Sequence, residues 1–154
     1  MTSGTVVFAP VGGRVLPLHQ VPDQVFAEAL VGPGAAIDPA RGGRLIAVSP
    51  VAGKIVKLHP HAFVVLTADG AGVLVHLGID TMQLAGAGFD LLVSEGATVD
   101  AGVGVVAWDP AAVAAGGRSA VCPVVALDAD ASALSGVRES GDLAAGDPLF
   151  TWIR

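Results

Sequence analysis

Four histidines occur in this chain of 154 residues, and three of them are candidates for chemistry. His59 and His61 stand two positions apart, and His76 ends an apolar segment further along the chain. That segment is rich in β-branched and aliphatic residues, which indicates a buried strand. Imidazole can act at neutral pH as a nucleophile, a proton carrier or a metal ligand. The open alternatives are therefore phosphoryl transfer, metal binding, or neither.

A β-hairpin is predicted to bring two of these histidines together. His61 begins a predicted strand that continues through Ala62–Thr67, and Leu74–His76 ends the next strand. The segment Ala68–Gly72 between them has the composition of a tight turn. Because His61 and His76 lie at similar distances from this turn, we expect their imidazoles to face each other across an antiparallel ladder.

The rest of the chain has the composition of a compact β-protein. Hydrophobic residues make up 53% of the sequence and charged residues 14%, which is too apolar for a disordered chain. The length predicts one domain, residues 1–154, with a sizeable core. The 21 glycines and 10 prolines leave few windows long enough for a helix. We therefore predict an all-β fold, an antiparallel β-sandwich, with one or two short helical turns near residues 22–30 and 110–116.

An internal sequence repeat predicts how this fold is organised. Residues 5–18 and 45–58 align at an offset of 40, and each copy reads strand, proline-containing turn, glycine, strand. Two further segments resemble each other, Ser94–Gly102 and Glu139–Asp147, and each leads into a predicted strand. The repeat predicts two similar β-motifs packed together, a sandwich built by duplication.

Charge and cysteine content exclude several classes of function. The net charge is −6 and no basic cluster occurs, which argues against nucleic acid as a partner. No apolar run reaches the roughly 18–20 residues needed to cross a bilayer, so we expect no membrane insertion. Residues 1–11 lack the features of a signal peptide, and we infer a cytoplasmic protein. The single cysteine, Cys122, excludes an intrachain disulfide and a cysteine-cluster metal site, and its apolar neighbours indicate a buried, inert thiol.

An ordered set of motifs covers almost the whole chain and resembles the glucose-type enzyme IIA domain of the bacterial sugar phosphotransferase system. Each motif alone is weak, but together they keep the order of that family. The motifs are Ala9-Pro10-Val11-Gly12-Gly13, Val21-Pro22-Asp23-Gln24-Val25-Phe26-Ala27-Glu28, Val31-Gly32-Pro33-Gly34-Ala35-Ala36-Ile37, Pro50-Val51-Ala52-Gly53, His61-Ala62-Phe63, Val75-His76-Leu77-Gly78-Ile79-Asp80-Thr81, Leu84-Ala85-Gly86-Ala87-Gly88-Phe89 and Pro123-Val124-Val125.

The resemblance implies a phosphoryl carrier. His76 would take a phosphoryl group on Nε2 from the phosphorylated histidine phosphocarrier protein (HPr) and pass it to the enzyme IIB domain of a sugar transporter. His61 would stabilise the transferring group. A backbone carbonyl near Gly78 would hold Nδ1 of His76. No metal or other cofactor is implied, regulatory partners are possible, and a monomer is expected.

The resemblance also implies a partner-binding surface around the histidines. Asp23 and Asp80 would lie on its rim and meet arginines of the two partners. Four apolar side chains would surround the imidazoles: Phe26, Phe63, Leu74 and Leu77. One departure concerns the support of His61, because His59 stands where the family usually has threonine and is followed by Pro60.

A zinc site is the alternative. His59 and His61 would share a strand face, and with His76 they could provide three nitrogen ligands. The segment His76-Leu77-Gly78-Ile79-Asp80 resembles a ligand motif of lysostaphin-type zinc peptidases, although the order of the two histidine motifs is reversed here. This alternative predicts a peptidase that uses His59, His61, His76 and Asp80. Adventitious zinc at His61 and His76 is its weaker form.

Overall fold

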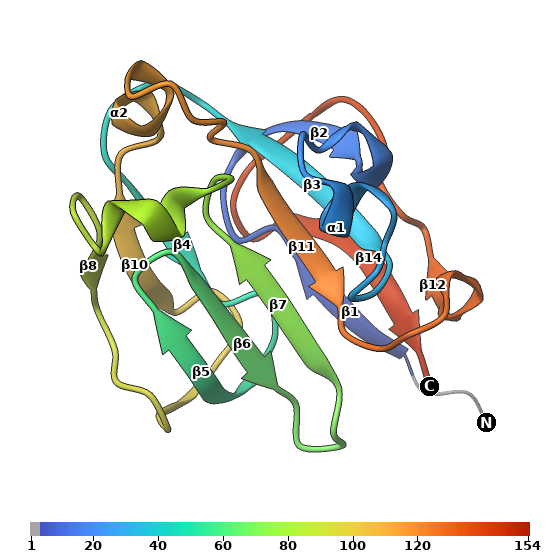
Figure 1. Ribbon diagram of the computed structural model, residues 1–154. Helices are drawn as coiled ribbons and strands as arrows, with labels where there is room; N and C mark the ends of the chain where they lie inside the picture. Colours follow the sequence, from blue (N-terminus) through green and yellow to red (C-terminus); the bar gives the residue numbers. More distant parts are fainter. Residues whose placement is uncertain (1–3) are drawn as a thin grey trace.

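The computed structural model describes residues 4–154 and consists mainly of antiparallel strands (Figure 1). The prediction of an all-β fold is confirmed. The elements in chain order are β1 (Gly4–Phe8), β2 (Gly13–Pro17), η1 (Leu18–Gln20), α1 (Gln24–Ala27), β3 (Gly34–Pro39), β4 (Leu45–Val48), β5 (Gly53–His59), β6 (Ala62–Leu66), β7 (Gly72–His76), η2 (Thr81–Leu84), β8 (Asp90–Leu91), β9 (Thr98–Val99), β10 (Gly104–Trp108), α2 (Pro110–Ala115), β11 (Cys122–Ala126), η3 (Ala131–Ala133), β12 (Leu134–Ser135), β13 (Asp142–Leu143) and β14 (Pro148–Ile153).

Within residues 4–154, the strands form one large sheet and two small ones. The large sheet has the order β13-β2-β3-β11-β7-β6-β5-β9, and the small sheets have the orders β1-β14-β12 and β4-β10-β8. A continuous cluster of buried apolar side chains fills the interior, and Trp108, Phe63 and Phe150 are the bulkiest fully buried members. β7, which carries His76, lies between β11 and β6 in the middle of the large sheet (Figure 1).

Reciprocal backbone hydrogen bonds confirm the predicted duplication. The N–H of Phe8 donates to the carbonyl of Pro50, and the N–H of Val48 donates to the carbonyl of Pro10, both across 2.9 Å. These two bonds are related by the offset of 40 residues found in the sequence. The two proline-containing turns are therefore packed against each other with approximate two-fold symmetry.

The second pair of similar segments obeys the same symmetry. Gly53 pairs with Val99 where β5 meets β9, and the equivalent Gly13 pairs with Leu143 where β2 meets β13. Trp108 of β10 and Trp152 of β14 also occupy equivalent positions, opposite Leu45 and Thr5. Thus β9 and β10 in one motif correspond to β13 and β14 in the other.

Both predicted helical turns are present, and the first is shorter than expected. The carboxylate of Asp23 caps α1 by accepting hydrogen bonds from the backbone N–H groups of Val25 and Phe26. The chain leaves the helix near Ala29, whose φ of 54° is left-handed, so Leu30 is not helical. Asp109 caps α2 in the same way, and Pro110 stands in its first turn.

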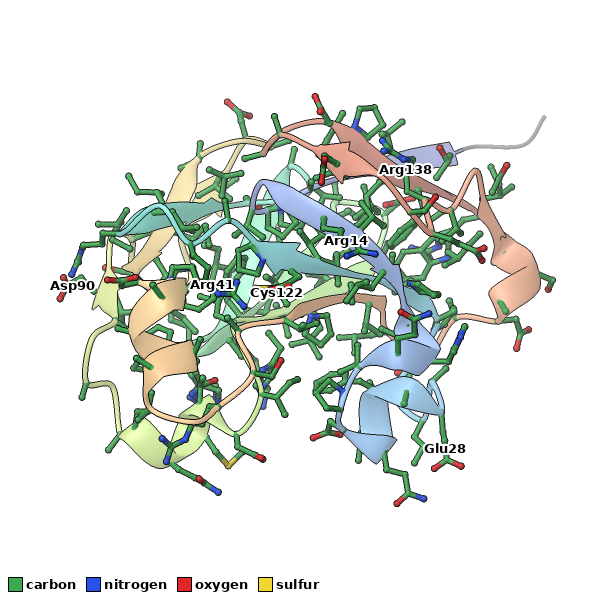
Figure 2. The ribbon with its side chains drawn as sticks, turned by 90° about the horizontal axis from the view of Figure 1, so that it is seen from above. Arg14, Glu28, Arg41, Asp90, Cys122 and Arg138 are labelled. Atoms are coloured by element: carbon green, nitrogen blue, oxygen red, sulfur yellow. The ribbon has the colours of Figure 1, made fainter. Side chains whose placement is uncertain are left out.

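The lone cysteine is buried in β11, inside the molecule (Figure 2). Burial raises the pKa of the Cys122 thiol to about 12, so the thiol is protonated at neutral pH and unreactive, as the sequence predicted. None of the helices within residues 4–154 is long and apolar enough to cross a membrane.

Candidate functional site

His76 is placed on the outer face of the large sheet by the alternation of β7. Val73 and Val75 point into the core and are fully buried, whereas Leu74 and His76 point outward and are partly exposed. The two buried valines anchor β7 in the core. The same strand therefore holds the His76 imidazole at the surface.

The structure corrects the position of His61. Ala62, rather than His61, lies directly opposite His76, and β6 begins at Ala62. His61 belongs to the tight turn between β5 and β6, and its carbonyl accepts a hydrogen bond from the N–H of Leu77. The two imidazoles nevertheless meet, with ring centroids 5.3 Å apart and planes 65° apart. The predicted juxtaposition is thus present, but the turn produces it rather than the strand ladder.

A backbone hydrogen bond fixes the tautomer of His76. Nδ1 lies 2.5 Å from the carbonyl oxygen of Gly78. A carbonyl oxygen can only accept, so Nδ1 must carry the hydrogen. In the neutral imidazole Nε2 then has the free lone pair, and this nitrogen is the nucleophilic one.

The loop that supplies this carbonyl is held from two sides. Thr81 is buried, and its hydroxyl donates to the carbonyl of Leu77 across 2.7 Å. The N–H of Ile79 donates to the carbonyl of Ser119 across 2.9 Å. Gly78 itself has a left-handed φ of 78°, and a Cβ there would lie 2.7 Å from Cγ2 of Thr81. Glycine is therefore required for the carbonyl to reach the His76 ring.

The surroundings keep both imidazoles neutral near pH 7. Burial lowers the pKa of His76 below the ordinary 6.5, although the Gly78 hydrogen bond and the charges of Asp23 and Asp80 oppose this shift. The pKa of His61 is also lowered, first by burial and then by the proximity of His76 and His59. A neutral imidazole retains the lone pair that a nucleophile needs.

One side of the site is formed by α1 and the residues beneath it. Phe26 is only 8% exposed, and its ring centroid lies 5.3 Å from that of His76, with the planes 59° apart. Phe26 belongs to a second apolar cluster on the outer face of the sheet, against which Leu74 packs. Its members are Leu18, Val21, Phe26, Ala36, Ile79, Val121 and Val125.

Two of the expected surface residues lie in the core instead. Phe63 is 1% exposed and Leu77 is fully buried, because both side chains point to the inner face of the sheet. Neither can touch a partner without rearrangement of the core, so we remove both from the predicted apolar ring. Asp23 is partly exposed, and Asp80, four residues after His76, is exposed with a left-handed φ of 59°.

The structure adds residues that the sequence reasoning missed. Met82, two residues after Asp80, is 63% exposed, and Val25, directly before Phe26, is 44% exposed. Val25 stands inside one of the quoted motifs and Met82 directly follows another, and the apolar character of both was the available signal. A hollow of about 430 Å³ adjoins Asp80. Two of its lining residues are joined by a hydrogen bond, which Arg118 donates to Oε1 of Gln83. Its lining includes Pro22, Ile79, Asp80, Gln83, Arg118 and Ser119.

The residues expected to form a zinc site are not arranged as one. Within residues 4–154, no group of three or more histidine, cysteine, aspartate or glutamate side chains is positioned to hold a metal ion. His61 lies in a turn, so the shared strand face that the alternative required is not formed. The zinc-peptidase alternative is therefore unsupported.

Taken together, the fold and the site define a class: a small antiparallel β-protein that presents one nucleophilic imidazole, with a second imidazole beside it, on an exposed face. The family model described as "phosphoenolpyruvate-dependent sugar phosphotransferase system, EIIA 1" matches residues 5–132. The chain therefore belongs to this family, a family of phosphotransferase components, and its relatives include glucose-specific members.

Three relatives illustrate the match. The chain is 42% identical over 92% of its length to the N-acetylglucosamine-specific EIICBA component of Escherichia coli, of which it covers 22%. It is 37% identical over 85% of its length to the glucose-specific EIIA component of Bacillus cereus, of which it covers 79%. The solved structure of glucose permease IIA from Mycoplasma capricolum superposes with a TM-score of 0.88 at 33% identity, covering 97% of this chain and 96% of that one. The chain thus spans about a fifth of the EIICBA relative.

Proposed function

We propose that this protein is a phosphoryl carrier of the sugar phosphotransferase system and that His76 carries the phosphoryl group. The observation that carries this proposal is the Nδ1 hydrogen bond to Gly78, which leaves Nε2 free beside a second imidazole. Nε2 attacks the phosphorus of a phosphohistidine on the donor protein. The donor's N–P bond breaks as the new N–P bond forms, and the donor imidazole takes back its electron pair. Transfer to the acceptor repeats this exchange with His76 as the leaving group.

His61 stabilises the group in transit. A phosphoryl group passing between proteins needs alignment and compensation of its negative charge. The His61 ring is close enough for an N–H donor to reach an oxygen of a phosphoryl group on His76. A charge-assisted hydrogen bond of this kind contributes about 1.5–3 kcal/mol. Only the two imidazoles are assigned to the transfer, and the proposal assigns no metal ion to the site.

Two proteins would dock in turn on the face that surrounds His76. The donor would be the histidine phosphocarrier protein (HPr), and the acceptor would be a sugar-specific enzyme IIB, since the EIICBA relatives combine such components in one chain. Asp23, Asp80, Phe26 and Leu74 remain as proposed contacts, and Val25 and Met82 join them because they are exposed beside the site. We further propose a monomer that works in the cytoplasm, where phosphoenolpyruvate is made. The relatives' names point to glucose or N-acetylglucosamine as the sugar transported.

The test is reconstitution. The protein is incubated with phosphoenolpyruvate, enzyme I and HPr, and its intact mass is measured before and after acid treatment. Wild type should gain one acid-labile phosphoryl group, and His76→Gln should gain none. His61→Gln should still accept the group but pass it slowly to enzyme IIB. An unchanged mass for wild type would overturn the proposal, and a wild-type donation rate for His61→Gln would overturn the role of His61.

A further inference from the structure

A third imidazole lies against the pair. His59 is the last residue of β5, and its ring stacks on that of His61, with centroids 5.6 Å apart and planes only 21° apart. His59 pairs with Ala62 across the strands, so Pro60 and His61 alone form the turn between them. The stack therefore crosses a turn whose ends the sheet holds in place.

The stacking of His59 on His61 is a contact that can restrict the rotation of the His61 ring. Within residues 4–154, the His61 ring makes no hydrogen bond to another residue that would fix its rotation, and it is partly exposed. Its neighbours among the rings are His76, which it meets edge-on, and His59, which it meets nearly face to face. By contrast, the His76 ring is fixed by its Nδ1 hydrogen bond. Packing against His59 is thus the contact best suited to restrict the side-chain torsions of His61.

We propose that His59 is a positioning residue: its ring holds the His61 imidazole in the rotamer that faces His76. His59 forms no bond to the phosphoryl group and acts only through His61. The orientation itself is a property of the unphosphorylated protein, whereas its consequence for transfer rests on the proposed carrier function. Because transfer depends on alignment, release of the His61 ring would slow it.

Substitutions can separate stacking from other roles of His59. His59→Phe keeps a flat ring and removes the ring nitrogens, so it should preserve the orientation of His61. His59→Ala removes the ring and should release His61. Lys57→Ala is the matched control, because Lys57 is an exposed residue on the same strand and pairs with Val64 rather than with a residue beside either imidazole. Both positions are exposed, so all three variants should fold.

The first measurement uses the unphosphorylated protein. Three-bond couplings across the Cα–Cβ bond of His61, measured by NMR, should report a single rotamer in wild type, in His59→Phe and in Lys57→Ala. His59→Ala should give averaged couplings. A single unchanged rotamer in His59→Ala would overturn the proposal whether or not the protein carries a phosphoryl group.

The second measurement is the rate of transfer from the phosphorylated protein to enzyme IIB. An aromatic contact of this kind corresponds to a change of about two- to tenfold in rate. His59→Ala should be slower by that factor, and His59→Phe and Lys57→Ala should transfer at the wild-type rate. Failure of His59→Phe to restore the rate, with His61 held in one rotamer, would contradict positioning as the role of His59. If wild type accepts no phosphoryl group at all, the carrier function fails, and the couplings alone decide the orientation.

Discussion

The carbonyl oxygen of Gly78 accepts the Nδ1 hydrogen of His76 across 2.5 Å, and the two residues are only two positions apart in the chain. The ring is therefore fixed by the very loop that it precedes. This short connection makes the tautomer of His76 depend on the backbone conformation of one glycine, whose φ is 78°.

Gly78→Ala should destabilise the protein and disturb the His76 tautomer. The left-handed φ alone costs on the order of 1–2 kcal/mol for a residue with a Cβ. The new Cβ would also lie 2.7 Å from Cγ2 of Thr81 and 3.0 Å from the Ser119 carbonyl, which adds roughly 1–3 kcal/mol. Gly70→Ala is the control, because Gly70 has a φ of 92° and open space around its Cβ position. Denaturant unfolding of both variants should show the larger loss for Gly78→Ala; equal losses would contradict the crowding argument.

The two carboxylates near His76 should differ in what they stabilise. Asp23→Ala removes the cap of α1 and should cost about 0.5–2 kcal/mol of unfolding free energy, whereas Asp23→Asn keeps a capping side chain. Asp80 makes no capping hydrogen bond, so Asp80→Asn should change stability little. Both Asn variants should lower the pKa of His76, because each removes a negative charge that raises it. An NMR titration of His76 checks this, and a raised midpoint in either variant would contradict it.

The pH dependence of phosphoryl acceptance should follow the lowered pKa of His76. Burial keeps the imidazole neutral below the pH at which a free imidazole is half-protonated. The single-turnover rate of acceptance should therefore hold steady as the pH falls to 6.5 and decline only below it. The NMR midpoint of His76 should lie below 6.5 in the native protein and return to about 6.5 in denaturant. A native midpoint above 6.5 would show that the carboxylates outweigh burial.

The same shifts predict how stability depends on pH. Because the pKa values of His76 and His61 are lowered on folding, the unfolded chain binds protons first as the pH falls below 6.5. The contribution of these histidines to unfolding free energy is therefore complete above pH 6.5 and is lost as the pH falls through their native pKa values. Urea unfolding between pH 7.5 and 5.5 should show a smaller loss for His76→Gln than for wild type. An equal loss of unfolding free energy in the two proteins would mean that groups other than His76 cause the pH dependence.

Substitution of a buried apolar residue near the site should lower the unfolding free energy far more than substitution of an exposed one. Leu77→Ala should cost about 2–5 kcal/mol, because Leu77 is fully buried in the main core. Met82→Ala should change stability by less than about 0.5 kcal/mol, because Met82 is 63% exposed. If Met82 contacts a partner, its variant should raise the KM for HPr or enzyme IIB while its unfolding midpoint stays at the wild-type value. A stable Leu77→Ala would contradict the assignment of Leu77 to the core.

The sequence by itself determined the architecture and singled out the two histidines that the structure brings together. Frequent glycine and proline excluded long helices, and the offset of 40 residues predicted a duplication that appears as reciprocal hydrogen bonds between Phe8, Pro50, Val48 and Pro10. These features are local or periodic, so they can be read without knowledge of long-range packing. The β6–β7 hairpin that brings the two backbones close was predictable for the same reason, whereas the turn that directs the His61 ring toward His76 was not.

Only the tertiary structure decided how each side chain is used. It placed His61 in a turn instead of a strand, buried Phe63 and Leu77, and stacked His59 on His61. A shift of one residue at a strand end reverses the face on which a side chain lies, and composition does not fix that boundary. The capping role of Asp23 and the acceptor role of the Gly78 carbonyl likewise depend on backbone angles that the fold imposes. The residue types of the proposed site could therefore be found in the sequence, whereas their geometry was set by the way the two β-motifs pack.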